Sequence, residues 1–164
     1  MPHVLYLLWF ACSGAGGDTA SPPIEEEGSC DRTDGERVEA TLLTKDPSYE
    51  MEPSPDWGTV IETDEAYQVL KGRLGQALEP VDFSTHVVLG SWVYSDCTCG
   101  IELDGWKVED MDGRPHLTAA FTDLSSGCET CCETSGGGLV LVATARGNGP
   151  GSVCRMIQPG CVEE

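Results

Sequence analysis

The sequence predicts an α+β domain, a mostly antiparallel β-sheet with one packed helix, held together by disulfide bonds. Three observations predict it. One helix-like pattern is followed by six strand-like patterns along the chain. The 164 residues include 20 glycines and 10 prolines, a composition that favours turns and strands over a helical bundle. The nine cysteines indicate an oxidising compartment, in which thiols pair.

The first residues have the pattern of an export signal. Residues 4–11 are an unbroken apolar run that ends in the small residue Ala11, directly before Cys12. Such a run is too short for a membrane-spanning helix, which needs about 20 residues. It is typical of the apolar region and cleavage point of a signal peptide, although Lys and Arg are missing ahead of it. We therefore predict a lipoprotein-type signal peptide over residues 1–11 and lipidation of Cys12, with a cleaved secreted protein as the alternative.

The residues after Cys12 predict a tether and then a single domain. Residues 12–29 are small, polar and acidic and contain two adjacent prolines, as flexible linkers do. Residues 30–164 are long enough for one α+β domain with a sizeable core. The residue directly after Cys12 is Ser13, whereas an Asp at this position favours retention of a lipoprotein in the inner membrane. We expect an outer-membrane lipoprotein of the cell envelope that faces the periplasm or the surface and contacts the membrane through its lipid.

The first half of the predicted domain contains strand, loop and helix signals. A strand is expected over residues 37–44, a proline-punctuated loop after it, and a short strand over residues 57–61. Apolar residues then recur at helical spacing over residues 64–77, with Thr63 or Asp64 as the N-cap.

The second half predicts a run of strands. Strands are expected over residues 85–94, 100–104, 106–111, 116–122, 139–144 and 152–157. Asp112-Gly113 is a tight-turn signal that would join two of them as a hairpin, and the three glycines at 136–138 predict a flexible hinge.

Alternation along the central strands predicts which side chains are buried. Four residues are expected on the covered faces of neighbouring strands in a half-covered sheet: Val87, Leu89, Val140 and Val142. Val69 and Leu70 of the helix should pack on that sheet. Glu102 and Asp104 should lie on its solvated face.

The cysteines other than Cys12 are even in number, as a disulfide framework requires. They are Cys30, Cys97, Cys99, Cys128, Cys131, Cys132, Cys154 and Cys161. No connectivity follows from the sequence, although the adjacent pair 131–132 does not suit disulfide geometry. If the end of the strand after residue 85 lies beside the glycine-rich segment, Cys97 and Cys99 would reach the cysteines at 128–132.

Two other uses of these cysteines compete with structural disulfides. Cys97-x-Cys99 and Cys128-x-x-Cys131 supply four thiolates, as a zinc site would, but the first spacing is too short. The second pair has oxidoreductase spacing, but Glu129 beside it disfavours the thiolate. We therefore predict no metal ion and no cofactor, and keep a thiol-based metal or redox protein as an alternative.

Charge and motifs restrict the function further. The net charge is −19, which excludes a basic footprint for nucleic acid, so no nucleic acid is expected as a partner. No motif of a nucleophile, paired carboxylates or a histidine-containing metal site is present, and we predict no catalytic residues and no enzyme activity. The prediction is a non-enzymatic, lipid-anchored structural or protein-interaction module with an envelope protein as partner.

Three runs resemble a known family. They are residues 59–67, the segment Pro80-Val-Asp-Phe-Ser84, and residues 87–89. In this order they resemble the PrcB-like domain of exported bacterial proteins, in which a strand and a helix lead to such a turn and then to a central strand. The resemblance covers residues 58–146. It implies a binding or regulatory subunit of an envelope protease, our alternative function.

Overall fold

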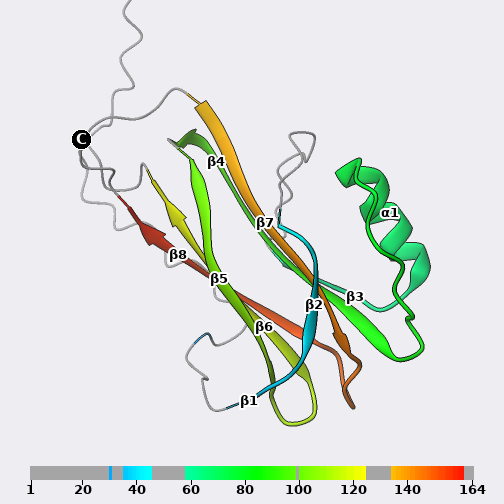
Figure 1. The fold of residues 1–164 in the computed structure, drawn as a ribbon. Coiled ribbons are helices and arrows are strands. Elements are labelled where there is room, and N and C mark those ends of the chain that lie inside the picture. The colour runs from blue at the N-terminus through cyan, green and yellow to red at the C-terminus, as the bar shows by residue number, and fades with distance from the viewer. Residues whose placement is uncertain (1–29, 31–34, 46–57, 99, 125–133, 161–164) are drawn as a thin grey trace, which may run out of the picture.

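Two four-stranded sheets pack face to face, and a helix lies on the outer side of one of them (Figure 1). The structure, a computed structural model, describes residues 30, 35–45, 58–98, 100–124 and 134–160, without the side chains of residues 95–98, 134, 135 and 159. Sheet A has the order β1 (Glu36–Arg37), β5 (Ile101–Asp110), β6 (Pro115–Asp123), β8 (Ser152–Pro159). Sheet B has the order β2 (Ala40–Thr44), β7 (Thr134–Ala145), β4 (His86–Thr98), β3 (Gly58–Ile61). The helix is α1 (Asp64–Leu74).

The predicted α+β class is therefore confirmed in outline, because strands dominate the described residues and one helix packs on them. Among the described pairings, only that of β6 with β8 is parallel, and every other one is antiparallel. The strands do not form one sheet. They form a sandwich, which buries the inner faces of both sheets against each other.

Helix α1 begins and ends at the residues that its sequence favours. Thr63 is the N-cap, and its side-chain oxygen accepts a hydrogen bond from the backbone N–H of Ala66 at 3.3 Å. Gly75 ends the helix in the left-handed region, with a φ of 61°, so the helix is shorter than the predicted 64–77. Its buried side chains are Tyr67 and Leu74.

The expectation for Val69 is wrong, whereas that for Leu70 is confirmed. The side chain of Leu70 packs against the apolar cluster beneath the helix, but Val69 is 59% exposed. Residues 67, 70 and 74 recur at helical spacing and share one face, and position 69 points away from that face.

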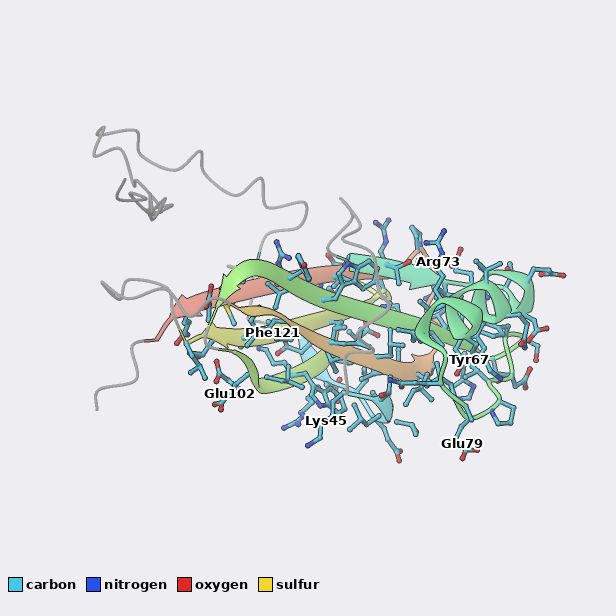
Figure 2. All side chains as sticks on the ribbon, turned by 90° about the horizontal axis from the view of Figure 1, so that it is seen from above. Lys45, Tyr67, Arg73, Glu79, Glu102 and Phe121 are labelled. Atoms are coloured by element: carbon cyan, nitrogen blue, oxygen red, sulfur yellow. A yellow bond between two sulfur atoms is a disulfide. The ribbon has the colours of Figure 1, made fainter. Side chains whose placement is uncertain are left out.

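The inner core confirms the four predicted residues of the central strands. Val87, Leu89, Val140 and Val142 are at most 1% exposed and pack with residues of sheet A, among them Phe121 (Figure 2). The prediction that this sheet is covered on one face only is nevertheless wrong for sheet B. A second cluster lies on its outer face and includes Val88, Leu141 and Leu74 of the helix. Burial on both faces explains why β4 and β7 read as nearly continuous apolar runs.

Two strand predictions are corrected by the pairing. Residues 37–44 are not one strand, because the chain leaves sheet A after Arg37 and enters sheet B at Ala40. Residues 100–104 and 106–111 are not two strands either, since β5 runs through both with an irregularity between Leu103 and Gly105.

The three glycines at 136–138 were predicted to form a hinge. This prediction is wrong, because they are part of β7. A Cβ on Gly138 would come within 2.7 Å of the ring of Phe121, so a glycine is needed where the two sheets approach each other closely.

Glu102 and Asp104 are exposed on β5, as predicted. The carboxylate of Asp104 accepts a hydrogen bond from the hydroxyl of Thr122 at 2.7 Å. No helix in the described part of the chain has the length and apolar character needed to span a membrane.

Candidate functional site

A row of polar residues crosses the outer face of sheet A, where each strand contributes one residue. Cross-strand partners along this row are Arg37 with Glu109, Glu109 with His116, and His116 with Ser152. We name these four residues the polar row. Residues opposite one another on neighbouring strands share a face of the sheet, so their side chains are neighbours.

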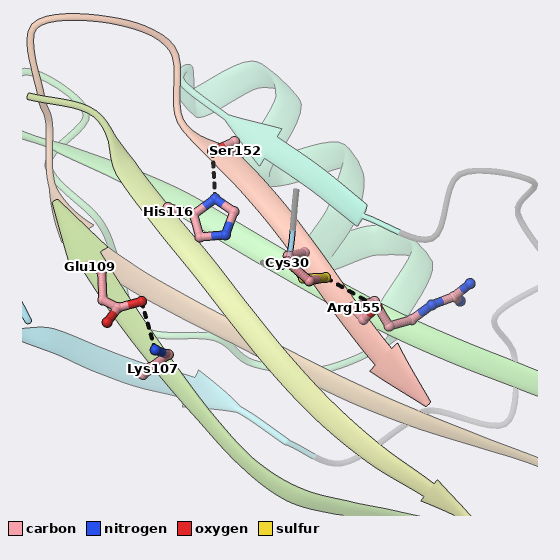
Figure 3. The surroundings of a disulfide bond; sticks show 7 residues. Cys30, Lys107, Glu109, His116, Ser152 and Arg155 are labelled. Carbon is pink, nitrogen blue, oxygen red and sulfur yellow. Dashed lines mark hydrogen bonds and ion pairs between the residues drawn. A yellow bond between two sulfur atoms is a disulfide. The ribbon is translucent and has the colours of Figure 1, made fainter. Parts of the chain in front are cut away.

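The contact between His116 and Ser152 joins the inner strand β6 to the edge strand β8 at this end of the row. Nδ1 of His116 lies 2.7 Å from Oγ of Ser152, within hydrogen-bond distance (Figure 3). His116 is only 3% exposed, and Thr118, two residues further along β6, is 7% exposed. Histidine and threonine usually lie at the surface, so their burial on an outer face is unusual.

The carboxylate of Glu109 is buried as well and is paired with a lysine. Nζ of Lys107 lies 2.8 Å from Oε2 of Glu109, and the glutamate residue is 6% exposed. Gly35 packs directly on this residue, because a Cβ added to Gly35 would lie 2.9 Å from Cβ of Glu109. A buried carboxylate is tolerated where a cation compensates it, as Lys107 does here.

A disulfide joins the start of the domain to its last strand. Cys30 is bonded to Cys154 of β8, with their Cα atoms 5.5 Å apart, and Cys154 is fully buried. The sulfur of Cys30 also lies 3.7 Å from the carbonyl oxygen of Arg155. Both residues are among the eight cysteines predicted to form disulfides. Their pairing could not be deduced from the sequence, because they are separated by 124 positions.

Arg155 extends from β8 to the other sheet. Its guanidinium donates a hydrogen bond to the carbonyl oxygen of Trp92 in β4 at 3.0 Å. Partial burial lowers the pKa of Arg155, since loss of water disfavours its charge. The arginine thus connects the edge of sheet A to sheet B beside the disulfide.

In nucleophilic catalysis, a histidine in contact with a serine accepts the proton of the serine hydroxyl, which then attacks the substrate. Acyl transfer also requires that a substrate carbonyl reach the serine oxygen and the histidine. The 3% exposure of His116 closes the pair to a substrate in this structure. Within the polar row, Glu109 and His116 are therefore buried, whereas Arg37 is exposed. Sequence reasoning missed it, because Ser152 and His116 belong to no motif and meet only through the pairing of β6 with β8.

Most other predicted site residues lie outside the described part of the chain. These are Cys12, Cys99, Cys128, Cys131, Cys132 and Cys161. Cys97 lies in β4, where the structure describes its backbone. No group of three or more histidine, cysteine or acidic residues within the described ranges is arranged to hold a metal ion.

The described residues that flank these cysteines meet at one end of the sandwich, which we name the cysteine end. Thr98 of β4 pairs with Thr134 of β7. The N–H of Leu124 donates to the carbonyl of Gly100 at 3.0 Å, and that of Gly160 donates to the carbonyl of Asp123 at 2.9 Å. The sequence left open whether the end of β4 lies beside the glycine-rich segment. The pairing of β4 with β7 shows that it does.

The motif that carries the family resemblance has a structural role here. One carboxylate oxygen of Asp82 accepts hydrogen bonds from the N–H and the hydroxyl of Ser84 at 3.0 and 2.6 Å, and the other accepts from the hydroxyl of Thr85. These bonds lower the pKa of Asp82, chiefly through the hydroxyl of Ser84. The turn directs the chain from α1 into β4.

Comparison with known proteins found no matching family model, no matching curated protein and no matching solved structure.

Proposed function

We propose that this chain is a lipid-anchored protein of the bacterial cell envelope that acts as a non-enzymatic structural or protein-interaction module. The disulfide between Cys30 and Cys154 is the observation that carries the proposal. Such bonds persist in the periplasm and at the cell surface and are rare in a reducing cytosol. This agrees with the apolar run before Cys12, which suggests export independently.

The place of Cys30 suits a tethered domain. Residues 12–29 form the predicted linker, and Cys30 is bonded to β8 directly after it. A pull on a lipid at Cys12 would therefore be transmitted to the eight-residue strand β8, and β1, with two residues, would be protected from it. A structural module between membrane and partner needs such an attachment.

The charge distribution favours a partner reached through the acidic segments. The described residues carry 14 acidic and 8 basic side chains, so they are only mildly acidic. The other 14 acidic residues are accompanied by a single basic one, Arg32. Segments of this composition repel nucleic acid and anionic lipid headgroups and attract basic protein surfaces.

We also propose that the six cysteines near the cysteine end form structural disulfides with one another. They precede or follow the described residues 98, 100, 124, 134 and 160, which the backbone brings together. A thiol-based metal or redox centre is the alternative for the same cysteines. Alkylation of the folded protein without reductant, followed by mass spectrometry, decides between them. No labelled cysteine is expected, whereas two or more labelled positions or bound zinc would favour the alternative.

The second candidate function is that of a binding or regulatory subunit of an envelope protease. The order of β3, α1, the turn at Asp82 and the central strand β4 is the order that the resemblance to the PrcB-like domain implies. Affinity capture from envelope extracts tests it. Recovery of a protease favours this candidate, and recovery of other envelope proteins favours the general module.

Substitution of the predicted anchor tests the localisation. Cys12→Ser should release the protein from the membrane fraction, and the uncleaved signal should remain detectable by mass. A matched control is Ser13→Ala, which leaves the cysteine in place and should stay membrane-bound. If Cys12→Ser remains in the membrane fraction, the lipid anchor is wrong.

A further inference from the structure

Asn148 is the only asparagine in the sequence, and the residue after it is Gly149. It is exposed and lies in the connection between β7 and β8, within the described part of the chain. An asparagine before a glycine readily loses its side-chain amide, because a residue without Cβ lets its backbone nitrogen approach the asparagine side chain. The surroundings of this pair decide how fast it reacts in the folded protein.

The connection that carries Asn148 is fixed to the turn between β5 and β6. The N–H of Asn148 donates a hydrogen bond to the carbonyl oxygen of Gly113 at 2.6 Å. Gly147 packs on the same carbonyl so closely that an added Cβ would overlap it. Among the described residues, by contrast, none accepts a hydrogen bond from the N–H of Gly149. Asn148 is therefore held in place, while the attacking nitrogen is not engaged by any of these residues.

The side chain of Arg114 lies against Gly149. A Cβ added to Gly149 would lie 2.8 Å from Nε and 3.2 Å from Cγ of Arg114. Deamidation begins when the backbone nitrogen of Gly149 loses its proton and attacks Cγ of Asn148, so negative charge develops on that nitrogen and then on the side-chain oxygen. A cation beside these atoms stabilises the developing charge. The guanidinium of Arg114 therefore favours the reaction.

The neighbouring pair Asp112–Gly113 could form a ring in the same way, but its surroundings oppose the reaction. The N–H of Gly113 donates to a carboxylate oxygen of Asp110 at 2.5 Å. This bond engages the attacking nitrogen, and the negative charge of Asp110 disfavours loss of its proton. The two glycine-containing pairs thus lie side by side with opposite electrostatic partners.

We propose that Asn148 is a site of spontaneous covalent modification, at which the folded protein deamidates through a cyclic imide with the help of Arg114. A bond forms between the nitrogen of Gly149 and Cγ of Asn148, and the bond from Cγ to Nδ2 breaks. The proton from Gly149 leaves with Nδ2 as ammonia. Water then opens the ring, either at Cγ, which gives aspartate, or at the backbone carbonyl, which gives isoaspartate.

Both products change this end of the sandwich. Each carries a carboxylate at position 148, beside the cationic Arg114. Isoaspartate also adds a methylene to the backbone between the hydrogen bond to Gly113 and the start of β8 at Ser152. We expect this insertion to weaken the contact between the two connections. The site depends neither on the proposed lipid anchor nor on a partner protein.

Incubation of the full chain at mildly alkaline pH, followed by peptide mapping with enzymatic methylation of isoaspartate, tests the proposal. Conversion is expected at position 148, and isoaspartate should form more slowly at Asp112. Arg114→Gln should slow the conversion about fivefold, the size of a charge interaction over a few ångströms in water. Arg114→Lys keeps the charge and should retain most of the rate. The matched control is Arg73→Gln, which removes an exposed arginine of α1 and should leave the rate unchanged.

Circular dichroism establishes that each variant is folded, and the same incubation in urea gives the rate of the unfolded chain. Three results would overturn the proposal. The first is no conversion in the folded protein while the unfolded chain reacts. The second is an equal rate in wild type and folded Arg114→Gln, and the third is faster formation of isoaspartate at Asp112 than at Asn148.

Discussion

The two outer faces of the sandwich are covered in opposite ways. On sheet B, helix α1 buries Tyr67 and Leu74 against Val88 and Leu141, with apolar side chains on both sides of the contact. On sheet A, three buried residues of the outer face are polar, namely Glu109, His116 and Thr118, and the described N-terminal residues attach to the sheet through the Cys30 disulfide and the two-residue strand β1.

The difference shows what each kind of cover needs. Burial of apolar surface stabilises the helix without a covalent bond, at roughly 25 cal/mol per Å² of area removed from water. Tyr67 adds a hydrogen bond from its hydroxyl to the carbonyl of Glu79 at 2.7 Å, and its ring meets that of Phe83 edge-on. Burial of a carboxylate and an imidazole contributes little by itself, because both lose water. On this sheet the structure shows a covalent attachment, the bond from Cys30 to Cys154 of β8, in place of an apolar contact with a helix.

The largest effect is expected on the apolar face. Leu74→Ala should lower the free energy of unfolding by about 2–5 kcal/mol, because it leaves a cavity beneath the helix. Leu74 is 1% exposed. Denaturant melts measure the change. Val69→Ala, on the exposed side of the same helix, is the matched control and should change stability by less than about 0.5 kcal/mol. Equal effects at the two positions would mean that α1 does not pack on sheet B.

Removal of the Cys30–Cys154 disulfide should have the next largest effect. Cys30→Ser with Cys154→Ala should lower the free energy of unfolding by about 2–4 kcal/mol under non-reducing conditions, since the bond restricts a long loop of the unfolded chain. Its partners are 124 residues apart. The same melt in excess reductant should abolish the difference between variant and wild type. If stability is unchanged without reductant, this bond does not stabilise the domain.

A smaller effect is expected at the start of the helix. Thr63→Ala removes the oxygen that accepts from the N–H of Ala66 and should cost about 1 kcal/mol. Thr63→Asp, which keeps an acceptor, is the control and should retain most of the stability.

The smallest effect concerns the turn between the helix and β4, and it depends on pH. Hydrogen bonds from Ser84 and Thr85 lower the pKa of Asp82 in the folded protein. Its stabilising effect is therefore present above 3.8, the pKa of an ordinary aspartate, and is lost as the pH falls through the lowered folded value.

Asp82→Asn should accordingly be less stable than wild type at neutral pH and approach it in stronger acid. Thermal melts at neutral pH and in stronger acid measure the difference in stability between variant and wild type. The control is Glu79→Gln, which changes another exposed acid in the same connection. A deficit that grows on acidification would contradict the assignment of Asp82.

Local sequence was sufficient to predict the parts of the fold that depend on short-range chemistry. The cap at Thr63, one of the two residues expected there, the helix that begins at residue 64, and the burial of Val87 and Leu89 depend on neighbours within a few positions of the chain. The exposure of Glu102 and Asp104 follows in the same way from alternation along a strand. The sequence also identified Cys30 and Cys154 as disulfide residues.

Only the tertiary structure decided the rest, because it depends on contacts between distant segments. Alternation indicates that a strand has a buried face, but it does not indicate whether the cover is a helix or a second sheet, so the two-sided burial of β4 was missed. The glycines at 136–138 have the composition of a hinge, and the close approach of Phe121 places them in a strand. The pairings of Cys30 with Cys154 and of His116 with Ser152 exist because β8 lies parallel to β6, and no local pattern encodes that adjacency.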